Sequence, residues 1–214
     1  MKVISVNVGL PVEIPIGERL VATGIFKEPV TGPVRVRTLN LDGDRQADLT
    51  VHGGVDKAVY MYPSEQYPFW ERELGGELSW GAFGENLTTE GLLETDVGIG
   101  DRMQIGSAEF LVTQPRQPCF KLGIRFGRDD MIHRFLASGR SGFYVRVVRE
   151  GAIAAGDAIR CVARAAGSMT VSEIFALYFD DEGRNDDLRR AAAAPGLSPS
   201  WKDHFLRRLD ALRS

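Results

Sequence analysis

Over residues 1–163 the chain is a succession of short β-rich segments separated by glycine and proline. Residues 34–38 alternate apolar side chains with arginines, which is typical of a half-buried strand. Residues 103–113 predict a tight hairpin around Gly106-Ser107. Because strand and helix segments do not alternate with a regular period, the pattern predicts a barrel-like β domain rather than a doubly wound sheet.

Further strands are expected over residues 58–62, 143–148 and 159–161. Pro63 is expected to end the first of these, because proline cannot donate to a strand ladder. Two short helices are predicted at about residues 64–74 and 129–137, and Pro68 makes the first of them irregular.

Small residues at 163–168 mark a change from β-rich to helical sequence. Thr170 and Glu173 form a capping-box pattern at the start of a first helix. A second helix is predicted at 187–194, and a third begins at Ser198-Pro199, with proline in its first turn.

These patterns together predict a mainly β chain of the α+β class. It comprises a β-barrel domain at residues 1–163 and a small three-helix domain at 170–214. The third helix places Trp201, Phe205, Leu209 and Leu212 on one face. So short a helical domain buries too little surface alone, so we expect part of that face to dock on the barrel or on a second subunit.

Charge and composition exclude several classes of partner. The chain has 26 Lys and Arg against 29 Asp and Glu, without the basic excess of a nucleic-acid-binding protein. Its tail, residues 170–214, is itself slightly acidic, which argues against a DNA-binding helix-turn-helix. No apolar run approaches a membrane span, and residues 3–8 predict a strand rather than a signal peptide. We expect a cytoplasmic protein with no membrane partner and no specific nucleic-acid partner.

Cys119 and Cys161 are too few for a disulfide framework. Cys119 follows a proline and lies between Arg116 and Lys121, and nearby cations favour the thiolate, the form that attacks and binds metals. From the residues alone, a reactive thiolate and an inert buried thiol are equally well supported. For Cys161, on an alternating strand, we predict a buried, inert thiol.

His52-Gly53-Gly54 and Lys57 form a second cluster, in which glycines allow close backbone approach and lysine attracts an anion. A hairpin loop with a surface lysine explains the same residues and is favoured on local grounds. Glu85 and Asn86 could grip a polar heterocycle or could cap a turn, and turn chemistry is favoured.

Other reaction classes lack their motifs. The chain contains no Cys-x-x-Cys pair, no phosphate-binding Walker loop and no Gly-x-Ser-x-Gly elbow. Its three histidines are widely separated, which argues against a structural zinc site. A nucleophile pair of Cys119 with His52 stays open, because sequence spacing cannot test it.

Three ordered blocks together resemble a known family. They are Val-His-Gly-Gly-Val-Asp-Lys-Ala-Val-Tyr (51–60), Phe-Gly-Glu-Asn-Leu-Thr (83–88) and Gln-Pro-Arg-Gln-Pro-Cys-Phe-Lys-Leu (114–122). With the tail sequence Leu-Ser-Pro-Ser-Trp (197–201), they resemble the molybdenum cofactor sulfurase C-terminal (MOSC) family in its YiiM-type branch.

The resemblance implies a MOSC β-barrel followed by a three-helix domain, and a molybdenum–molybdopterin cofactor. It implies that Cys119 is a ligand of molybdenum, for which a soft thiolate suits a metal already held by dithiolene sulfur. Lys57 and Arg116 would suit the cofactor phosphate. The candidates for contacts to cofactor or substrate are His52, Gly53, Gly54, Lys57, Glu85, Asn86 and Arg116.

The activity implied is reduction of small N-hydroxylated compounds, such as hydroxylaminopurine-type base analogues and amidoximes. Relatives that include the mitochondrial amidoxime reducing component carry out such reductions. We assign His52 as the proton donor and Cys119 as the metal ligand. The chain has no recognisable flavin or haem site, so electrons are expected from a separate reductase protein, and a homodimer is compatible with the sequence. The alternative is a sulfur carrier that holds a persulfide on Cys119.

Overall fold

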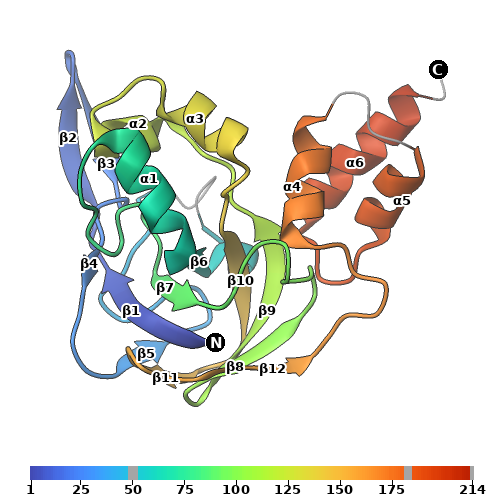
Figure 1. The fold of residues 1–214 in the computed structure, drawn as a ribbon, viewed down its shortest axis with the longest axis horizontal. Coiled ribbons are helices and arrows are strands. Elements are labelled where there is room, and N and C mark those ends of the chain that lie inside the picture. Colours follow the sequence, from blue (N-terminus) through green and yellow to red (C-terminus); the bar gives the residue numbers. More distant parts are fainter. Residues whose placement is uncertain (48–52, 181–184, 213–214) are drawn as a thin grey trace.

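The computed structural model describes residues 1–47, 53–180 and 185–212 (Figure 1). Eight strands form the main sheet in the order β12-β8-β9-β10-β6-β7-β1-β4. Their bounds are β1 Lys2–Val8, β4 Glu28–Pro29, β6 Val59–Pro63, β7 Leu87–Glu90, β8 Arg102–Ile105, β9 Ala108–Pro115, β10 Phe143–Arg149 and β12 Ile159–Ala163. Two small two-stranded sheets pair β2 (Val12–Ile16) with β3 (Arg19–Thr23), and β5 (Val34–Val36) with β11 (Gly151–Ile153).

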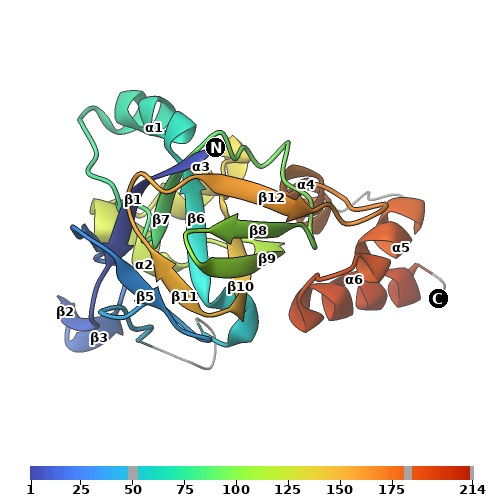
Figure 2. The ribbon, with the colours of Figure 1, turned by 90° about the horizontal axis from the view of Figure 1, so that it is seen from below.

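The main sheet curls until its two sides meet (Figure 2). Lys2 forms a bridge with Ala158, and the Ile159 amide donates to the Met1 carbonyl at 3.0 Å. β1 therefore closes against the start of β12. This closure confirms the predicted barrel, and the hairpin of β8 and β9 around Gly106-Ser107 is also as predicted.

Alternation along β6 separates two cores. Val59 and Met61 belong to the apolar core inside the barrel, whereas Tyr60 and Tyr62 belong to a second buried cluster on its outside. Side chains outside the barrel are buried because helices cover them. Contrary to the prediction, β6 includes Pro63, because the parallel pairing with β7 continues to that residue.

The helical elements between the strands are two 3-10 turns and three α-helices. They are η1 (Val55–Lys57), η2 (Ser64–Gln66), α1 (Tyr67–Leu74), α2 (Phe120–Phe126) and α3 (Met131–Ser138). The helix predicted at 64–74 is therefore divided between η2 and α1, with Pro68 in the first turn of α1, where it removes no helical hydrogen bond. The sequence pattern did not predict α2.

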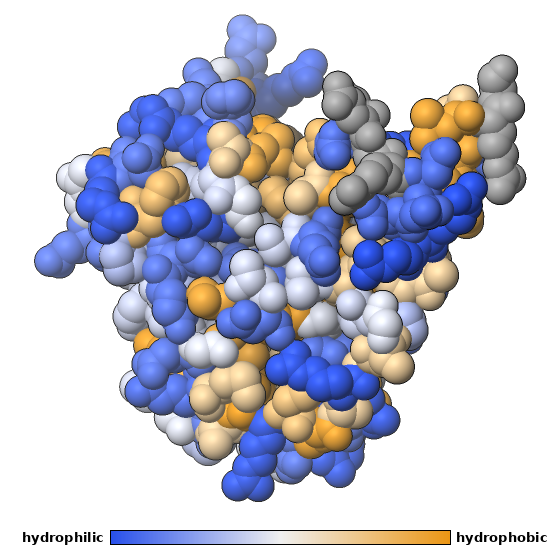
Figure 3. All heavy atoms as spheres, turned by 45° about the vertical axis from the view of Figure 1, so that its right-hand side comes forward, coloured by the Kyte–Doolittle hydropathy of each residue, from blue (hydrophilic) through white to orange (hydrophobic). Residues whose placement is uncertain are grey.

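The tail forms α4 (Val171–Phe179), α5 (Asn185–Ala193) and α6 (Pro199–Ala211). The Thr170–Glu173 capping box is present, as predicted. Trp201, Phe205 and Leu209 are buried in one cluster with the interior of the barrel, while Leu212 is 58% exposed. Part of the apolar face of α6 therefore docks on the barrel, as predicted. Figure 3 shows mostly polar residues on this side of the molecule, with apolar residues in separate small groups. The apolar face of the tail is therefore largely turned inward.

A loop of the barrel holds the connection to the tail. The Ile99 amide donates to the Met169 carbonyl at 2.9 Å, and the Val171 amide donates to Val97 at 2.9 Å. The Asp101 carboxylate accepts from the Ala165 amide at 3.0 Å and from Arg164 Nη1 at 2.6 Å. The Gly98–Asp101 segment therefore anchors the tail.

Cys161 differs from its prediction. Its side chain is only half-buried on β12, and the neighbouring Val162 is 47% exposed. No helix in the described ranges combines the length and apolarity needed to cross a membrane.

Candidate functional site

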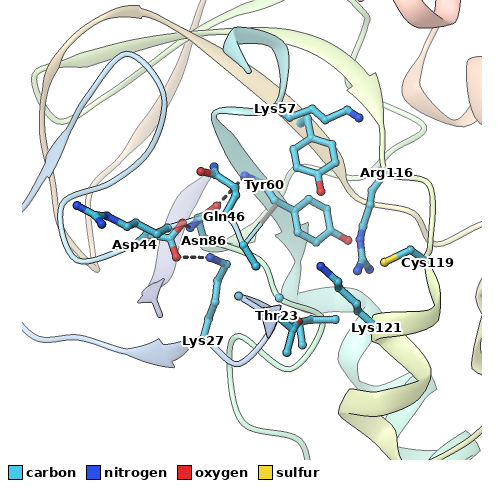
Figure 4. Close-up of a pocket in the computed structure, with 16 residues that line it drawn as sticks. Thr23, Lys27, Asp44, Gln46, Lys57, Tyr60, Asn86, Arg116, Cys119 and Lys121 are labelled. Atoms are coloured by element: carbon cyan, nitrogen blue, oxygen red, sulfur yellow. Dashed lines mark hydrogen bonds and ion pairs between the residues drawn. The ribbon is translucent and has the colours of Figure 1, made fainter. Parts of the chain in front are cut away.

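A pocket enclosing about 570 Å³, part of it open to solvent, lies on the outside of the barrel next to the start of α2 (Figure 4). Segments distant in sequence build it: the chain after β3, the chain before the undescribed residues 48–52, η1, β6, β10 and the link from β9 to α2. The lining residues are Thr23, Gly24, Ile25, Lys27, Asp44, Arg45, Gln46, Ala47, Lys57, Tyr60, Gly84, Asn86, Arg116, Cys119, Lys121 and Tyr144.

One row of side chains across neighbouring strands forms a wall of this pocket. Tyr144 of β10 pairs with Tyr60 of β6, and the Asn86 amide donates to the Tyr60 carbonyl at 2.8 Å. Directly opposed residues of a sheet share one face, so the three side chains point to the same side. The Tyr60 and Tyr144 ring centroids are 5.1 Å apart.

Arg116 is the most informative residue of the pocket. Its side chain is buried, with Cζ 5.0 Å from the ring centroid of Tyr60 and 5.3 Å from that of Phe135. Its Nη1 atom is buried and has no hydrogen-bond partner among the described residues. A buried charged donor without a partner costs free energy that a bound anion would recover.

Cys119 lies where the chain turns into α2. Its backbone is extended, with φ −130° and ψ 171°, and its carbonyl accepts from the Leu122 amide at 2.9 Å. Figure 4 shows its sulfur on the side of the cavity where the Arg116 guanidinium and the Lys121 amine also point. Lys121 is 8% exposed. The structure thus brings one thiol and two cations together.

Lys27, Asp44 and Asn86 form a buried polar network at the opposite side of the pocket. Asp44 Oδ1 pairs with Lys27 Nζ, and Oδ2 accepts from Asn86 Nδ2 at 2.9 Å. Burial lowers the pKa of Lys27, and the charge of Asp44 opposes that shift. Asn86 Oδ1 accepts from the Tyr60 amide at 3.1 Å. Asn86 therefore lines the pocket, but its amide is occupied in joining Asp44 to β6.

Glu85 does not reach the pocket, which corrects the prediction of a ligand contact. Its carboxylate is fully buried and accepts from the Gly81 amide at 2.9 Å, the Phe83 amide at 3.1 Å and the Tyr67 hydroxyl. Burial raises the pKa of Glu85, while these hydrogen bonds oppose the shift. The carboxylate holds its own loop together.

The second predicted cluster is only partly brought to the pocket. Lys57 of η1 lines it, and burial lowers the pKa of Lys57, with the charge of Asp56 opposing the shift. Gly54 has φ 96°, which a residue with a side chain rarely adopts, and it leads the chain into η1. Gly53 and Gly54 do not line the pocket. His52 lies outside the described residues.

Several lining residues were not predicted. Lys27, Asp44 and Arg45 were not among the candidate contact residues. Tyr60 and Tyr144 fit the strand alternation, which shows that they share a face with neighbours but not what covers it. Among the described residues, the charged side chains that line the pocket are five cations and one carboxylate: Lys27, Arg45, Lys57, Arg116, Lys121 and Asp44. This composition suits an anionic ligand.

Comparison with known proteins agrees with this fold. A family model described as the MOSC domain matches residues 48–160, more than half of the chain. The chain belongs to the MOSC family. A second model, the YiiM-like 3-alpha helix domain, matches residues 169–211 and places this MOSC protein in the YiiM-type branch.

Two relatives of this MOSC protein match over nearly its whole length, and a third matches two thirds of it. YflK of Bacillus subtilis is 40% identical over 210 residues, covering 98% of this chain and 95% of YflK. The crystal structure of YiiM from Geobacillus stearothermophilus gives a TM-score of 0.82 at 38% identity, covering 97% of this chain and 98% of that chain. A protein of Gibberella moniliformis named Reductase is 36% identical over 148 residues, which cover 67% of this chain and 26% of that longer protein.

Proposed function

We propose that this MOSC protein binds a molybdenum–molybdopterin cofactor at the Cys119 pocket and reduces N-hydroxylated compounds. The main support for this proposal is that the Cys119 thiol and Arg116 line the same pocket. Arg116 is a buried cation whose Nη1 has no hydrogen-bond partner among the described residues. A thiolate is a soft donor suited to molybdenum held by dithiolene sulfur, and a guanidinium suits a phosphate. The donor set therefore fits this cofactor.

In this proposal Cys119 holds the metal, and Arg116, Lys57 and Lys121 hold the anionic groups. When bound, the cofactor supplies the two-electron chemistry by which R–NH–OH, two electrons and two protons give R–NH₂ and water. The relative named Reductase supports an oxidoreductase assignment. Electrons would come from a separate reductase protein in the cytoplasm.

The protein's own side chains would shape the substrate site. Tyr60 and Tyr144 offer aromatic faces to a planar ring. Burial raises the pKa of both tyrosines, so they stay neutral, and the Tyr60 hydroxyl already donates to the Ser141 carbonyl at 2.8 Å. Tyr60 is therefore a wall rather than a proton source. The assignment of His52 as proton donor stays a prediction.

Metal content tests the proposal directly. Wild type, Cys119→Ser and Cys161→Ser are expressed in a cofactor-competent host, and molybdenum per chain is measured by elemental analysis. Only Cys119→Ser is expected to lose molybdenum, because a hydroxyl does not replace a soft thiolate. Cys161→Ser is the matched control, since Cys161 lies on β12 and does not line the pocket. Equal molybdenum in both variants would overturn the ligand assignment.

The same preparations separate the rival function, a sulfur carrier with a persulfide on Cys119. Cyanide releases persulfide sulfur as thiocyanate, which is measured alongside molybdenum. Wild type that contains Cys119-dependent cyanide-labile sulfur and no molybdenum would favour the carrier.

A further inference from the structure

We infer that Thr113 is a positioning residue through which the three-helix tail sets the place of Lys57 in the pocket. This inference rests on the proposed role of Lys57 as an anion contact. It begins from an irregularity in β9. Tyr144 of β10 pairs with Gln114 and the next residue, Val145, pairs with Val112, so Thr113 is left out of the ladder as a β-bulge.

The bulge leaves the backbone carbonyl of Thr113 free for a partner outside the ladder with β10. Its backbone carbonyl accepts from the Ser198 amide at 3.2 Å, immediately before α6 begins at Pro199. Its hydroxyl lies 2.6 Å from the Asp56 carbonyl and 3.0 Å from the Tyr144 carbonyl. A hydroxyl has one hydrogen, and the shorter distance assigns it mainly to Asp56.

Asp56 is the centre of η1, the three-residue turn that presents Lys57 to the pocket. Its carboxylate accepts from Arg146 Nε at 3.0 Å and from Nη2 at 2.5 Å. The Lys57 amide donates to the Gly54 carbonyl at 3.1 Å. Within the described residues, the turn is therefore fixed by a strand guanidinium on one side and by the Thr113 hydroxyl on the other.

These contacts form a continuous path from the tail to the pocket: Ser198, Thr113, Asp56 and Lys57. Thr113 is fully buried, so water does not replace its hydroxyl when that group is removed. Loss of the hydroxyl would leave the Asp56 carbonyl without this donor and loosen the turn. Lys57 would then spend less time in the position that holds an anion.

The test measures binding of inorganic phosphate to the apo-protein by calorimetry at constant ionic strength. Thr113→Val should weaken phosphate binding about 3- to 10-fold, the range for loss of one hydrogen bond. Thr113→Ser keeps the hydroxyl and should stay within about twofold of wild type. In a Lys57→Ala background, Thr113→Val should have no further effect, because the effect passes through Lys57. Hydrogen exchange of the Lys57 amide should accelerate in Thr113→Val.

A matched pair on the tail tests the other end of the path. Ser198→Pro removes the amide donor, and the native φ of −62° is the value that proline adopts. Ser198→Ala keeps the amide and loses only the hydroxyl, which lies 3.3 Å from Ser200 Oγ. Ser198→Pro should weaken phosphate binding and Ser198→Ala should not. This pair also carries the test if Thr113→Val fails to fold.

The outcomes distinguish the two proposals. Phosphate binding that depends on Lys57 but is unchanged by Thr113→Val and Ser198→Pro would overturn only the positioning role. An equal fold-change for Thr113→Val with and without Lys57 would do the same, since it would indicate general loosening. If wild type binds no phosphate, the anion-binding role of Lys57 fails, and the positioning role fails with it. Molybdenum retention by Cys119 is judged separately by the metal measurement.

Discussion

A Cβ atom on Gly196 would lie 2.8 Å from the Cα atom of Gly100, so the loop before α6 and the loop before β8 meet backbone to backbone. Gly100 has φ +89° and Gly196 has φ +82°. Glycine is thus required at both positions for two reasons: the positive φ disfavours a side chain, and there is no space for a Cβ atom. The contact explains how the tail packs closely enough to share the apolar core of the barrel.

Gly100→Ala should destabilise the protein more than a conformational penalty alone. Its new Cβ would lie 2.4 Å from the Pro195 carbonyl oxygen, so the tail must shift. Gly156→Ala is the control, because Gly156 has φ +92° and no atom within 4 Å of its added Cβ. The free energy of unfolding should fall by about 1–2 kcal/mol in both variants, because alanine disfavours the left-handed conformation. In Gly100→Ala it should fall by about a further 1–3 kcal/mol, because the added Cβ overpacks the contact. Urea unfolding measures the difference, and equal losses would show that the contact yields without cost.

Arg116→Met should stabilise the apo-protein while abolishing binding of phosphate. The substitution removes a buried charge whose Nη1 has no partner among the described residues and keeps an apolar side chain against Tyr60 and Phe135. We expect a gain of about 1 kcal/mol in the free energy of unfolding. Arg125→Met should bring no gain, because Arg125 Nε donates to the Ala82 carbonyl at 3.3 Å. Denaturant titration with and without phosphate tests both, and a less stable Arg116→Met would contradict the argument.

Glu94 should make stability depend on pH. Its carboxylate accepts from the Gly142 amide at 2.8 Å and from Gln66 Nε2 at 2.9 Å, and burial raises its pKa despite these bonds. The folded protein therefore holds this proton to higher pH than the unfolded chain does. As pH rises from the ordinary carboxyl pKa through the raised one, the free energy of unfolding falls.

Glu94→Gln removes this titration and keeps a carbonyl oxygen for the Gly142 amide, while the Gln66 amide can turn to present its oxygen. The variant should be more stable than wild type at neutral pH, and the difference should shrink in acid. Thermal unfolding across the acid to neutral range measures it. A difference that grows in acid would have the wrong sign.

Holo-protein supplied with an artificial reductant should convert N-hydroxylated purines or amidoximes to the corresponding amines, and apo-protein should not. Product formation by chromatography is the measurement, with Cys119→Ser as the inactive control. Absence of conversion by well-loaded protein across a panel of such compounds would move the assignment to the sulfur carrier.

The sequence by itself determined the local features of this protein. Alternation over residues 34–38 predicted β5, the Thr170–Glu173 pair predicted the start of α4, and the Pro-Cys segment between cations marked Cys119. These features depend on neighbours within a few residues, where periodicity and capping are decided.

Only the tertiary structure decided which faces are covered and which residues meet. Local pattern treats Glu85 and Asn86 alike, yet Glu85 is enclosed by its own loop and Asn86 reaches the pocket. Lys27 and Tyr144 lie 117 positions apart in the numbering and line one cavity. Such long-range contacts depend on how the barrel closes and on which segment packs over each strand. A short stretch of sequence does not predict them, because its local pattern does not record packing against distant segments.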